Sequence, residues 1–143
     1  MIDFAKARDQ MVERYLMHRG IHSRLVLDAM RAVPRERFLP PELEEFAYED
    51  APLPIAEGQT ISQPYVVAMM IEALELRGGE RVLEVGTGSG YAAAVLAQIA
   101  GQVYSVERIG QLAEKAASAL SRASPRRFWR VASASLSRPT KYA

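Results

Sequence analysis

The stretch Glu84-Val85-Gly86-Thr87-Gly88-Ser89-Gly90 decides the fold of this 143-residue chain. It follows the apolar pair Val82-Leu83 and precedes a helical pattern over residues 91–100. A strand, a glycine-rich turn and a helix in this order bind nucleotide-like cofactors, because glycine lets the backbone approach the ligand and the helix start offers free N–H groups. The motif therefore predicts a cofactor-binding turn at the carboxyl end of a strand.

The spacing of the glycines narrows the class of cofactor. A dinucleotide-binding fingerprint reads G-x-G-x-x-G, and Tyr91 stands where its last glycine would be. The run here is instead acid-x-G-x-G-x-G, which resembles motif I of the S-adenosylmethionine-dependent methyltransferases. A second acid, Glu107, lies 17 residues past Gly90 at the end of the next apolar run. A ribose-binding carboxylate belongs at that place in such a sheet, so the pattern indicates S-adenosyl-L-methionine as the cofactor.

Two helices are expected near the N-terminus. Apolar residues recur three to four apart over residues 3–18, which predicts an amphipathic helix, and Gly20 stops the pattern. Ser23 is typical of the N-cap of a second helix, and Pro34 ends that helix.

A third helix is expected after an irregular connection. The segment between Pro34 and Pro54 carries further prolines, which favour irregular structure. Pro64 suits the first position of a helix, so we expect a helix over residues 64–76. We interpret its inner stripe, together with the Met69-Met70 pair, as core packing. The stripe consists of Val67, Met70, Ile71 and Leu74.

From residue 81 the pattern changes to alternating strands and helices. This alternation predicts an α/β fold, in which an N-terminal helical segment is followed by an incomplete Rossmann-like, doubly wound parallel sheet. Right-handed crossovers place the glycine turn and Glu107 together at the carboxyl edge of that sheet. The expected strands are residues 81–85, 103–107 and 128–131, and the expected helices are residues 91–100 and 110–120.

The composition excludes several kinds of site. The chain has no cysteine, so it forms no disulfide and offers no thiolate to a metal or a substrate. The adjacent acids Glu49 and Asp50 are expected to be a solvated or helix-capping pair, and no metal site is predicted. No apolar run reaches the roughly 18 residues of a transmembrane helix, and the first residues lack the apolar core of a secretory signal. We therefore expect a cytoplasmic protein without a membrane partner.

Charge divides the chain near residue 121. Residues 1–121 hold all 17 acids and 12 Lys or Arg residues, a net charge of −5, whereas residues 122–143 hold six Lys or Arg residues and no acid. We therefore divide the chain into an N-terminal helical segment (1–80), a cofactor-binding βαβα unit (81–121) and a basic, Ser/Arg-rich tail (122–143) that is expected to be poorly ordered. Nucleic-acid binding by the tail is the alternative, but no recognition module surrounds its aromatic residues, so no nucleic-acid partner is predicted.

Four segments of the first 121 residues resemble protein-L-isoaspartate O-methyltransferase. The segment at residues 58–68, with its Gly-Gln-Thr-Ile-Ser-x-Pro run, is far more specific than the glycine motif, which many unrelated methyltransferases share. The resemblance implies transfer of a methyl group from S-adenosyl-L-methionine to the α-carboxylate of an L-isoaspartyl residue, a step of protein repair. The four segments are Val33–Pro40, Tyr48–Ile55, Gly58–Ala68 and Val82–Tyr91.

This reaction makes modest demands on side chains. A carboxylate is ionised near neutral pH and needs no general base, and a sulfonium is already a good methyl donor. Catalysis then consists mostly of aligning the two groups and desolvating the carboxylate. A hydroxyl that orients the carboxylate is sufficient, and Ser62 matches the active-site serine of the family. The alternative role for Ser62 is to cap the helix that begins at Pro64.

The resemblance also assigns cofactor-binding residues. It places Glu107 at the ribose hydroxyls and Arg108 beside the adenine. The glycine motif packs against the methionine and ribose side of the cofactor, and the run before Pro64 contributes to the cleft that cofactor and substrate share. The expected cofactor-binding residues are Gln59, Thr60, Ile61, Ser62, Glu84, Gly86, Thr87, Gly88, Ser89, Gly90, Glu107 and Arg108.

The resemblance ends near Arg122. The family pattern continues through a third strand into a Gly-Asp-Gly turn beside the adenine, whereas this chain has Ala132-Ser133-Ala134-Ser135 near that point. We interpret the change as a truncation or a change of reading frame, so little or no activity and self-association through the incomplete sheet are expected. Two other hypotheses stay open: a methyltransferase for another class of substrate, and an inactive cofactor-binding or interaction protein.

Overall fold

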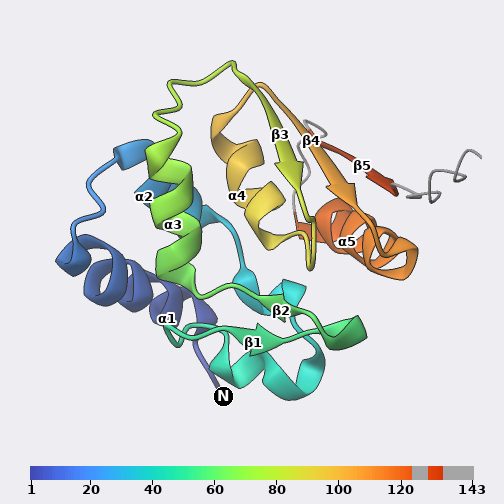
Figure 1. The fold of residues 1–143 in the computed structure, drawn as a ribbon. Helices are drawn as coiled ribbons and strands as arrows, with labels where there is room; N and C mark the ends of the chain where they lie inside the picture. Colours follow the sequence, from blue (N-terminus) through green and yellow to red (C-terminus); the bar gives the residue numbers. More distant parts are fainter. Residues whose placement is uncertain (124–128, 134–143) are drawn as a thin grey trace, which may run out of the picture.

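Helical elements from the N-terminal half surround one side of a three-stranded parallel sheet (Figure 1). The computed structural model describes residues 1–123 and 129–133. In Figure 1 the first helices lie beside the sheet. A short hairpin lies below the carboxyl ends of the sheet strands. Within the two described ranges, no helix has the length and apolar character needed to cross a bilayer.

The first helical segment follows the predicted range, but only its first part is α-helical. Helix α1 (Phe4–Met11) begins after Asp3, whose carboxylate accepts a backbone N–H of the first turn at 3.0 Å. A π-helical stretch (Val12–Leu16) and a 3-10 turn (Met17–Arg19) continue it. Gly20 ends the segment with a φ of +96°, a conformation that costs least for glycine.

Helix α2 (Arg24–Ala32) begins as predicted. The Ser23 hydroxyl accepts the Val26 N–H at 3.4 Å, which satisfies one of the free N–H groups of the first turn. The helix ends before Pro34, because a residue that precedes proline is disfavoured in the helical region. Its buried face packs against α4 (Tyr91–Ile99), so the N-terminal segment and the sheet share one core.

The connection after α2 is irregular, as the prolines predict, but it also contains a short hairpin that the sequence reading missed. Strands β1 and β2 pair antiparallel, with Leu53 opposite Ile61. The hairpin determines where Ser62 lies, because β2 leads directly into that residue. The elements are η3 (Arg35–Phe38), η4 (Pro41–Phe46), β1 (Leu53–Pro54), η5 (Ala56–Gly58) and β2 (Thr60–Ile61).

Helix α3 (Pro64–Ala73) begins at Pro64 as predicted, but its expected inner stripe is only half right. Val67 and Ile71 are buried, whereas Met70 and Leu74 are 62% and 52% exposed. The interpretation of Met69 and Met70 as core packing was also wrong, because both are exposed. The physical reason is that Met70 and Leu74 face a cavity beside the sheet, and the described residues leave that side of the helix open.

The sheet consists of β3 (Arg81–Val85), β4 (Gln102–Glu107) and β5 (Trp129–Ser133), in that order. Both pairings are parallel, and Val85 lies opposite Val106 at the carboxyl ends of β3 and β4. The strand predicted at 128–131 is confirmed as β5, although Phe128 itself lies outside the described residues.

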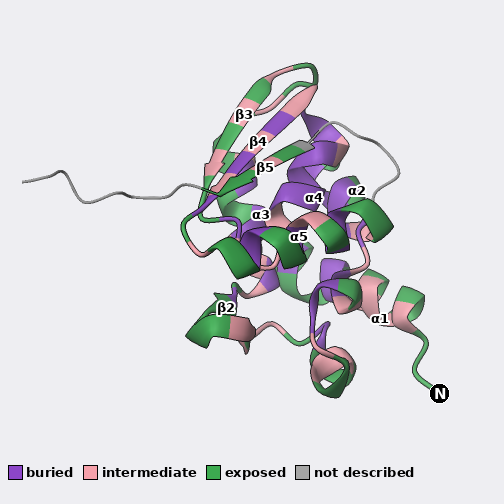
Figure 2. Ribbon diagram, turned by 90° about the vertical axis from the view of Figure 1, so that its right-hand side faces the viewer, coloured by how far each residue is buried: buried purple, intermediate pink, exposed green. Residues whose placement is uncertain are grey.

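Helices α4 and α5 (Gly110–Ala123) cover one face of the sheet (Figure 2). Side chains of β4 alternate between buried and half-buried, as expected for a strand with one covered face. On the other face Leu83 and Val85 of β3 are 64% and 82% exposed. Helix α5 ends two residues past the predicted boundary at 121. Most of the predicted tail, residues 124–128 and 134–143, lies outside the described residues.

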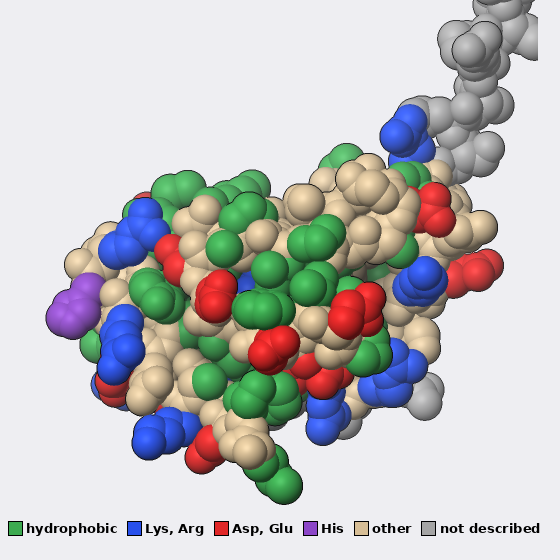
Figure 3. All heavy atoms as spheres, turned by 90° about the horizontal axis from the view of Figure 1, so that it is seen from below, with side chains coloured by type: hydrophobic (Ala, Val, Ile, Leu, Met, Phe, Trp, Pro, Cys, Tyr) green, Lys and Arg blue, Asp and Glu red, His purple; other side chains and the backbone are tan. Residues whose placement is uncertain are grey.

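Charges are mixed on the side of the molecule that carries the hairpin. Figure 3 shows that acidic side chains lie among apolar ones across this face, with Lys and Arg side chains toward its edges. A surface that binds nucleic acid by its phosphates is expected to be continuously basic. The face in Figure 3 is therefore unlike a nucleic-acid-binding surface.

We predict that Gly90→Ala destabilises the fold more than Gly20→Ala. Both glycines have a φ above +90°, so each substitution strains the backbone by about 1–2 kcal/mol. A Cβ on Gly90 would also lie 3.3 Å from both Ala116 and Leu120 of α5, whereas a Cβ on Gly20 meets nothing within 4 Å. Urea unfolding should show an additional loss of about 1–2 kcal/mol for Gly90→Ala. Equal losses for the two variants would contradict the tight packing of α4 on α5.

Candidate functional site

The glycine turn between β3 and α4 is fastened to the neighbouring strand. The Gly86 N–H donates to the Val106 carbonyl at 2.7 Å and so continues the β3–β4 pairing by one residue. The Gly88 N–H donates to Oε2 of Glu107 at 2.8 Å. The predicted meeting of the glycine turn and Glu107 at the carboxyl edge of the sheet is therefore present in the structure.

Glu107 is held by backbone donors. Its Oε1 accepts the Ile109 N–H at 3.0 Å, while Oε2 accepts the Gly88 N–H. Burial opposes ionisation of the carboxyl, but the N–H groups of Ile109, Gly88 and Arg108, together with the charge of Arg108, hold the pKa of Glu107 below its ordinary value. A fixed carboxylate at this edge has the chemistry needed to accept hydrogen bonds from the hydroxyls of a ribose.

Two hydroxyl groups, those of Ser105 and Thr87, follow one another from the carboxylate of Glu84. The Ser105 hydroxyl donates to Oε1 of Glu84 at 2.5 Å, and Thr87 Oγ1 lies 2.5 Å from Ser105 Oγ. Burial raises the pKa of Glu84 to about 7, although the Ser105 hydrogen bond works in the other direction, and the charge of Glu107 adds to the rise. The sequence reading missed Ser105, whose one signal is a polar residue within the apolar run of β4.

A cavity of about 350 Å³ joins the glycine turn to the start of α3. Eight of the predicted cofactor-binding residues line it: Thr60, Ile61, Ser62, Glu84, Gly86, Thr87, Gly88 and Ser89. The other four lie outside its lining. Gln59 and Arg108 are exposed, Gly90 packs on α5, and the carboxylate of Glu107 is engaged by the glycine turn.

Ser62 does not cap α3. The N-cap residue is Gln63, whose side chain makes no capping hydrogen bond, and the Tyr65 N–H is accepted at 3.1 Å by Oδ1 of Asp50. The alternative interpretation of Ser62 as a helix cap is therefore wrong, and Asp50 is the capping acid of the predicted Glu49-Asp50 pair. Ser62 is exposed and is one of the residues that line the cavity.

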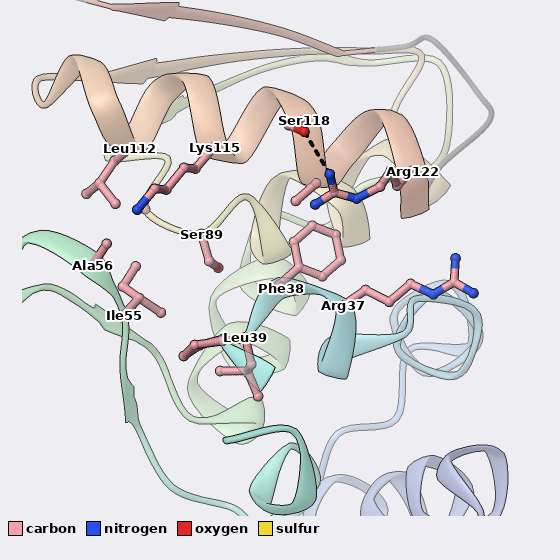
Figure 4. Close-up of a pocket in the computed structure, with 13 residues that line it drawn as sticks. Arg37, Phe38, Leu39, Ile55, Ala56, Ser89, Leu112, Lys115, Ser118 and Arg122 are labelled. Carbon is pink, nitrogen blue, oxygen red and sulfur yellow. Dashed lines mark hydrogen bonds between the residues drawn. The ribbon is translucent and has the colours of Figure 1, made fainter. Parts of the chain in front are cut away.

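A second cavity, of about 390 Å³, lies on the α5 side of the glycine turn (Figure 4). Gly88 and Ser89 line both cavities, so the turn separates them. In Figure 4 the Lys115 side chain extends into this second cavity, and Arg122 lies over Phe38 with its Nη1 bonded to Ser118 Oγ at 2.8 Å. Sequence reasoning missed this cavity because its walls come from η3, the hairpin and α5, which are far apart in the sequence.

Comparison with known sequences identifies one family. A sequence model of the family "Protein-L-isoaspartate(D-aspartate) O-methyltransferase (PCMT)" matches residues 6–134. A protein-L-isoaspartate O-methyltransferase 1 of Rhodopseudomonas palustris is 66% identical over 117 residues, which cover 82% of this chain and 48% of that protein. A protein-L-isoaspartate O-methyltransferase of Brucella anthropi is 61% identical over 116 residues, which cover 81% and 53%. The chain thus spans about half the length of the curated relatives it matches.

Solved structures show the same fold. A crystal structure from Plasmodium falciparum, of a protein-L-isoaspartate O-methyltransferase in complex with S-adenosyl-L-homocysteine, matches with a TM-score of 0.76 at 24% identity. The match covers 94% of this chain and 66% of that one. Another protein-L-isoaspartate O-methyltransferase matches with a TM-score of 0.76 at 30% identity over 88% of this chain and 41% of the other. The predicted fold class is confirmed.

We predict that Glu84→Gln makes the fold more stable at pH 8 and leaves its stability unchanged at pH 4. The folded state keeps the Glu84 proton up to a pKa of about 7, whereas the unfolded state releases it near the ordinary value of 4.5. Folding therefore binds a proton between these values, and the parent loses stability as the pH rises through this window.

The difference between variant and parent should reach on the order of 1–3 kcal/mol above pH 7, measured by urea unfolding at several pH values. Glu114→Gln, which replaces an exposed carboxylate on α5, is the matched control. A Glu84→Gln profile parallel to that of the parent from pH 4 to 8 would show that Glu84 ionises normally.

Proposed function

Because the chain belongs to the protein-L-isoaspartate O-methyltransferase family, we propose that it transfers a methyl group from S-adenosyl-L-methionine to the α-carboxylate of L-isoaspartyl residues in proteins. The observation that carries the proposal is the position of Ser62. Its exposed side chain, which α3 does not use as a cap, lines the same cavity as the glycine turn. The same cavity is thus lined by a glycine turn that could bind a nucleoside and by a serine whose hydroxyl could donate a hydrogen bond to a carboxylate.

The residues around the cavity fit the proposed cofactor. A volume of about 350 Å³ falls within the range of small-molecule sites, which is roughly 300–1,000 Å³. Apolar side chains from α3 and β3 form one wall, and the backbone of residues 86–89 forms another. Glu107 stands next to this turn and is the residue we propose to hold the ribose hydroxyls. Bound there, S-adenosyl-L-methionine supplies an electrophilic methyl group on a sulfonium.

The residues of this chain then contribute by aligning the substrate carboxylate with the methyl group. In the proposed reaction an oxygen of the isoaspartyl carboxylate would form a bond to the methyl carbon as the S–C bond breaks, and the electron pair of that bond would stay on sulfur. No proton moves, and the site therefore needs no general base. We propose that the Ser62 hydroxyl donates a hydrogen bond to the carboxylate and holds one oxygen in line with the methyl group.

Two rival functions are separated by experiment. A methyltransferase for another substrate would bind the cofactor and ignore isoaspartyl peptides. The mixed charges in Figure 3 do not favour a nucleic-acid substrate on that face. A protein that binds the cofactor without turnover would fit the other hypothesis, and binding should therefore be measured separately from methyl transfer.

We also propose that two copies of this chain associate through the open face of the sheet. Strand β3 is at the edge of the described sheet, with unpaired backbone groups on its free side. Leu83 and Val85 project from its open face, and the exposed Met70 and Leu74 of α3 lie across the first cavity from this strand. An edge strand with exposed apolar side chains is a template for pairing with another strand, and a second copy offers the same edge.

We predict that Ser62→Ala lowers the kcat for methylation of an isoaspartyl peptide by about 10-fold or more and changes the Kd of S-adenosyl-L-methionine less than about threefold. The loss of kcat follows because the Ser62 hydroxyl is proposed to orient the substrate carboxylate, and the other residues that line the cavity remain to bind the cofactor. Transfer from radiolabelled S-adenosyl-L-methionine gives kcat, and calorimetry gives Kd.

Ser121→Ala, an exposed serine on α5, is the matched control, and the normal aspartyl peptide is the negative substrate. Parent protein that binds the cofactor but labels neither peptide would refute the proposed reaction and leave both rival hypotheses. Labelling of both peptides alike would contradict selectivity for the isoaspartyl residue.

We predict that Val85→Lys shifts the sedimentation of the chain toward the monomer. A charge on the open face of β3 opposes strand pairing and burial of the apolar side chains. Leu25→Lys, at an exposed leucine of α2, is the control and should sediment as the parent does. A parent that is monomeric at tens of micromolar would end this proposal.

A further inference from the structure

Arg35 is a fully buried arginine next to the proposed site, with a relative exposure of 0%. Its Nη1 donates to the Ala47 carbonyl at 2.5 Å, and its Nη2 donates to the carbonyls of Ala51 and Ser62 at 3.2 Å and 3.0 Å. The guanidinium therefore ties three backbone positions together. One of them is the carbonyl of the residue proposed to orient the substrate.

Burying the Arg35 guanidinium costs free energy, so its burial calls for a structural reason. A buried charge loses its hydration, and burial lowers the pKa of Arg35 from its ordinary value. Among the described residues no carboxylate lies within salt-bridge distance of the guanidinium, and its Nε has no hydrogen-bond partner. An apolar side chain would fill the space at lower cost. The N–H groups of Arg35 thus bond to backbone carbonyls and form no ion pair with a described carboxylate.

The same guanidinium also touches the other wall of the site. It lies 5.7 Å from the ring centroid of Tyr91, which is the first residue of α4 after the glycine turn. Tyr91 in turn meets Phe38 of η3 edge to face, with the ring centroids 5.8 Å apart. Arg35 therefore connects Ser62 on one wall to the helix that follows the glycine turn on the other.

Asp50 holds the residues that follow Ser62. Its Oδ1 accepts the Tyr65 N–H at 3.1 Å, and its Oδ2 accepts Gln63 Nε2 at 3.3 Å and Nη1 of Arg19 at 2.6 Å. Arg19 stacks on the ring of Tyr65, 3.8 Å from its centroid. The segment from Ser62 to Tyr65 is thus held by the Arg35 guanidinium at the Ser62 carbonyl and by the Asp50 carboxylate at Gln63 and Tyr65.

We propose that Arg35 and Asp50 are positioning residues that fix the backbone of Ser62 against the glycine turn. The proposal rests on the proposed function of Ser62. Neither residue is among those that line the cavity. Arg35 holds the Ser62 carbonyl, and Asp50 holds the Tyr65 N–H at the start of α3. The Ser62 hydroxyl is therefore preorganised, which means that its position is fixed before the substrate binds.

Arg35→Lys is the test variant, because lysine keeps the charge but lacks the planar fork that reaches three carbonyls. Arg37→Lys, on the same 3-10 turn but exposed, is the matched control, and Asp50→Asn is a second test variant should Arg35→Lys not fold. For Arg35→Lys we expect a loss of kcat of about 10- to 100-fold per folded molecule, with the peptide KM changed less than about threefold.

A second measurement does not depend on turnover. Amide hydrogen exchange at residues 61–63 and 65 should become at least about tenfold faster in Arg35→Lys, while the amides of β4 keep their rates. A merely structural role would accelerate exchange throughout the core. Arg37→Lys should leave kcat and both exchange rates within about twofold of the parent.

The outcomes separate the two proposals. Unchanged exchange at residues 61–63 and 65 in a folded variant, or an unchanged kcat, would overturn the positioning role of Arg35. Acceleration at residues 61–63 and 65 in the absence of any methyl transfer by the parent would support the positioning role and count against the proposed reaction alone.

Discussion

The hydrogen bond between Glu107 and the Gly88 N–H is the constraint on which the site depends. Parallel pairing sets Val85 opposite Val106, so the next residues of the two strands meet at the carboxyl edge. Glu107 then accepts an N–H of the turn, and Gly86 extends the pairing by one more bond. Helix α4 begins directly after this turn and packs against α2 and η3. The position of the turn therefore also fixes where the N-terminal segment packs.

Buried polar contacts connect that segment to the sheet. The apolar core joins α2 and α4, but apolar packing alone is non-directional and tolerates small shifts. Arg35 adds a directional bond to the Ser62 carbonyl, and Asp50 adds one to the Tyr65 N–H three residues later. Together with the bond from the Gly88 N–H to Glu107, these bonds hold the glycine turn and the Ser62 segment, which form two walls of the cleft. An enzyme whose main task is to align a carboxylate with a methyl group benefits from this kind of precision.

Features with a local signal could be predicted from the sequence. Gly20, Ser23 and Pro64 mark helix boundaries by their own conformational preferences, and the spacing from Gly90 to Glu107 follows from the geometry of a βαβ unit. Helical periodicity identified the apolar side of α3 but not what covers it, so Met70 was misplaced.

Long-range contacts had no such signal. Arginine is almost never fully buried, so nothing in the pattern around Arg35 indicated its burial, and its three acceptors lie 12 to 27 residues further along the chain. The hairpin was missed because its two-residue strands, one ending in proline, carry no alternating pattern. Ser105 shows the same limit, because the role of a lone serine in a strand depends on what the neighbouring strand places beside it.

The central claim is that the glycine turn and the segment before α3 form one cofactor site, and titration of the ¹⁵N-labelled chain with S-adenosyl-L-homocysteine tests it most directly. The account predicts saturable chemical-shift changes at the amides of residues 60–62 and 86–90 together, because both segments line the same cavity. Changes confined to one of these segments, or changes only at the α5 cavity around Lys115 and Arg122, would contradict it.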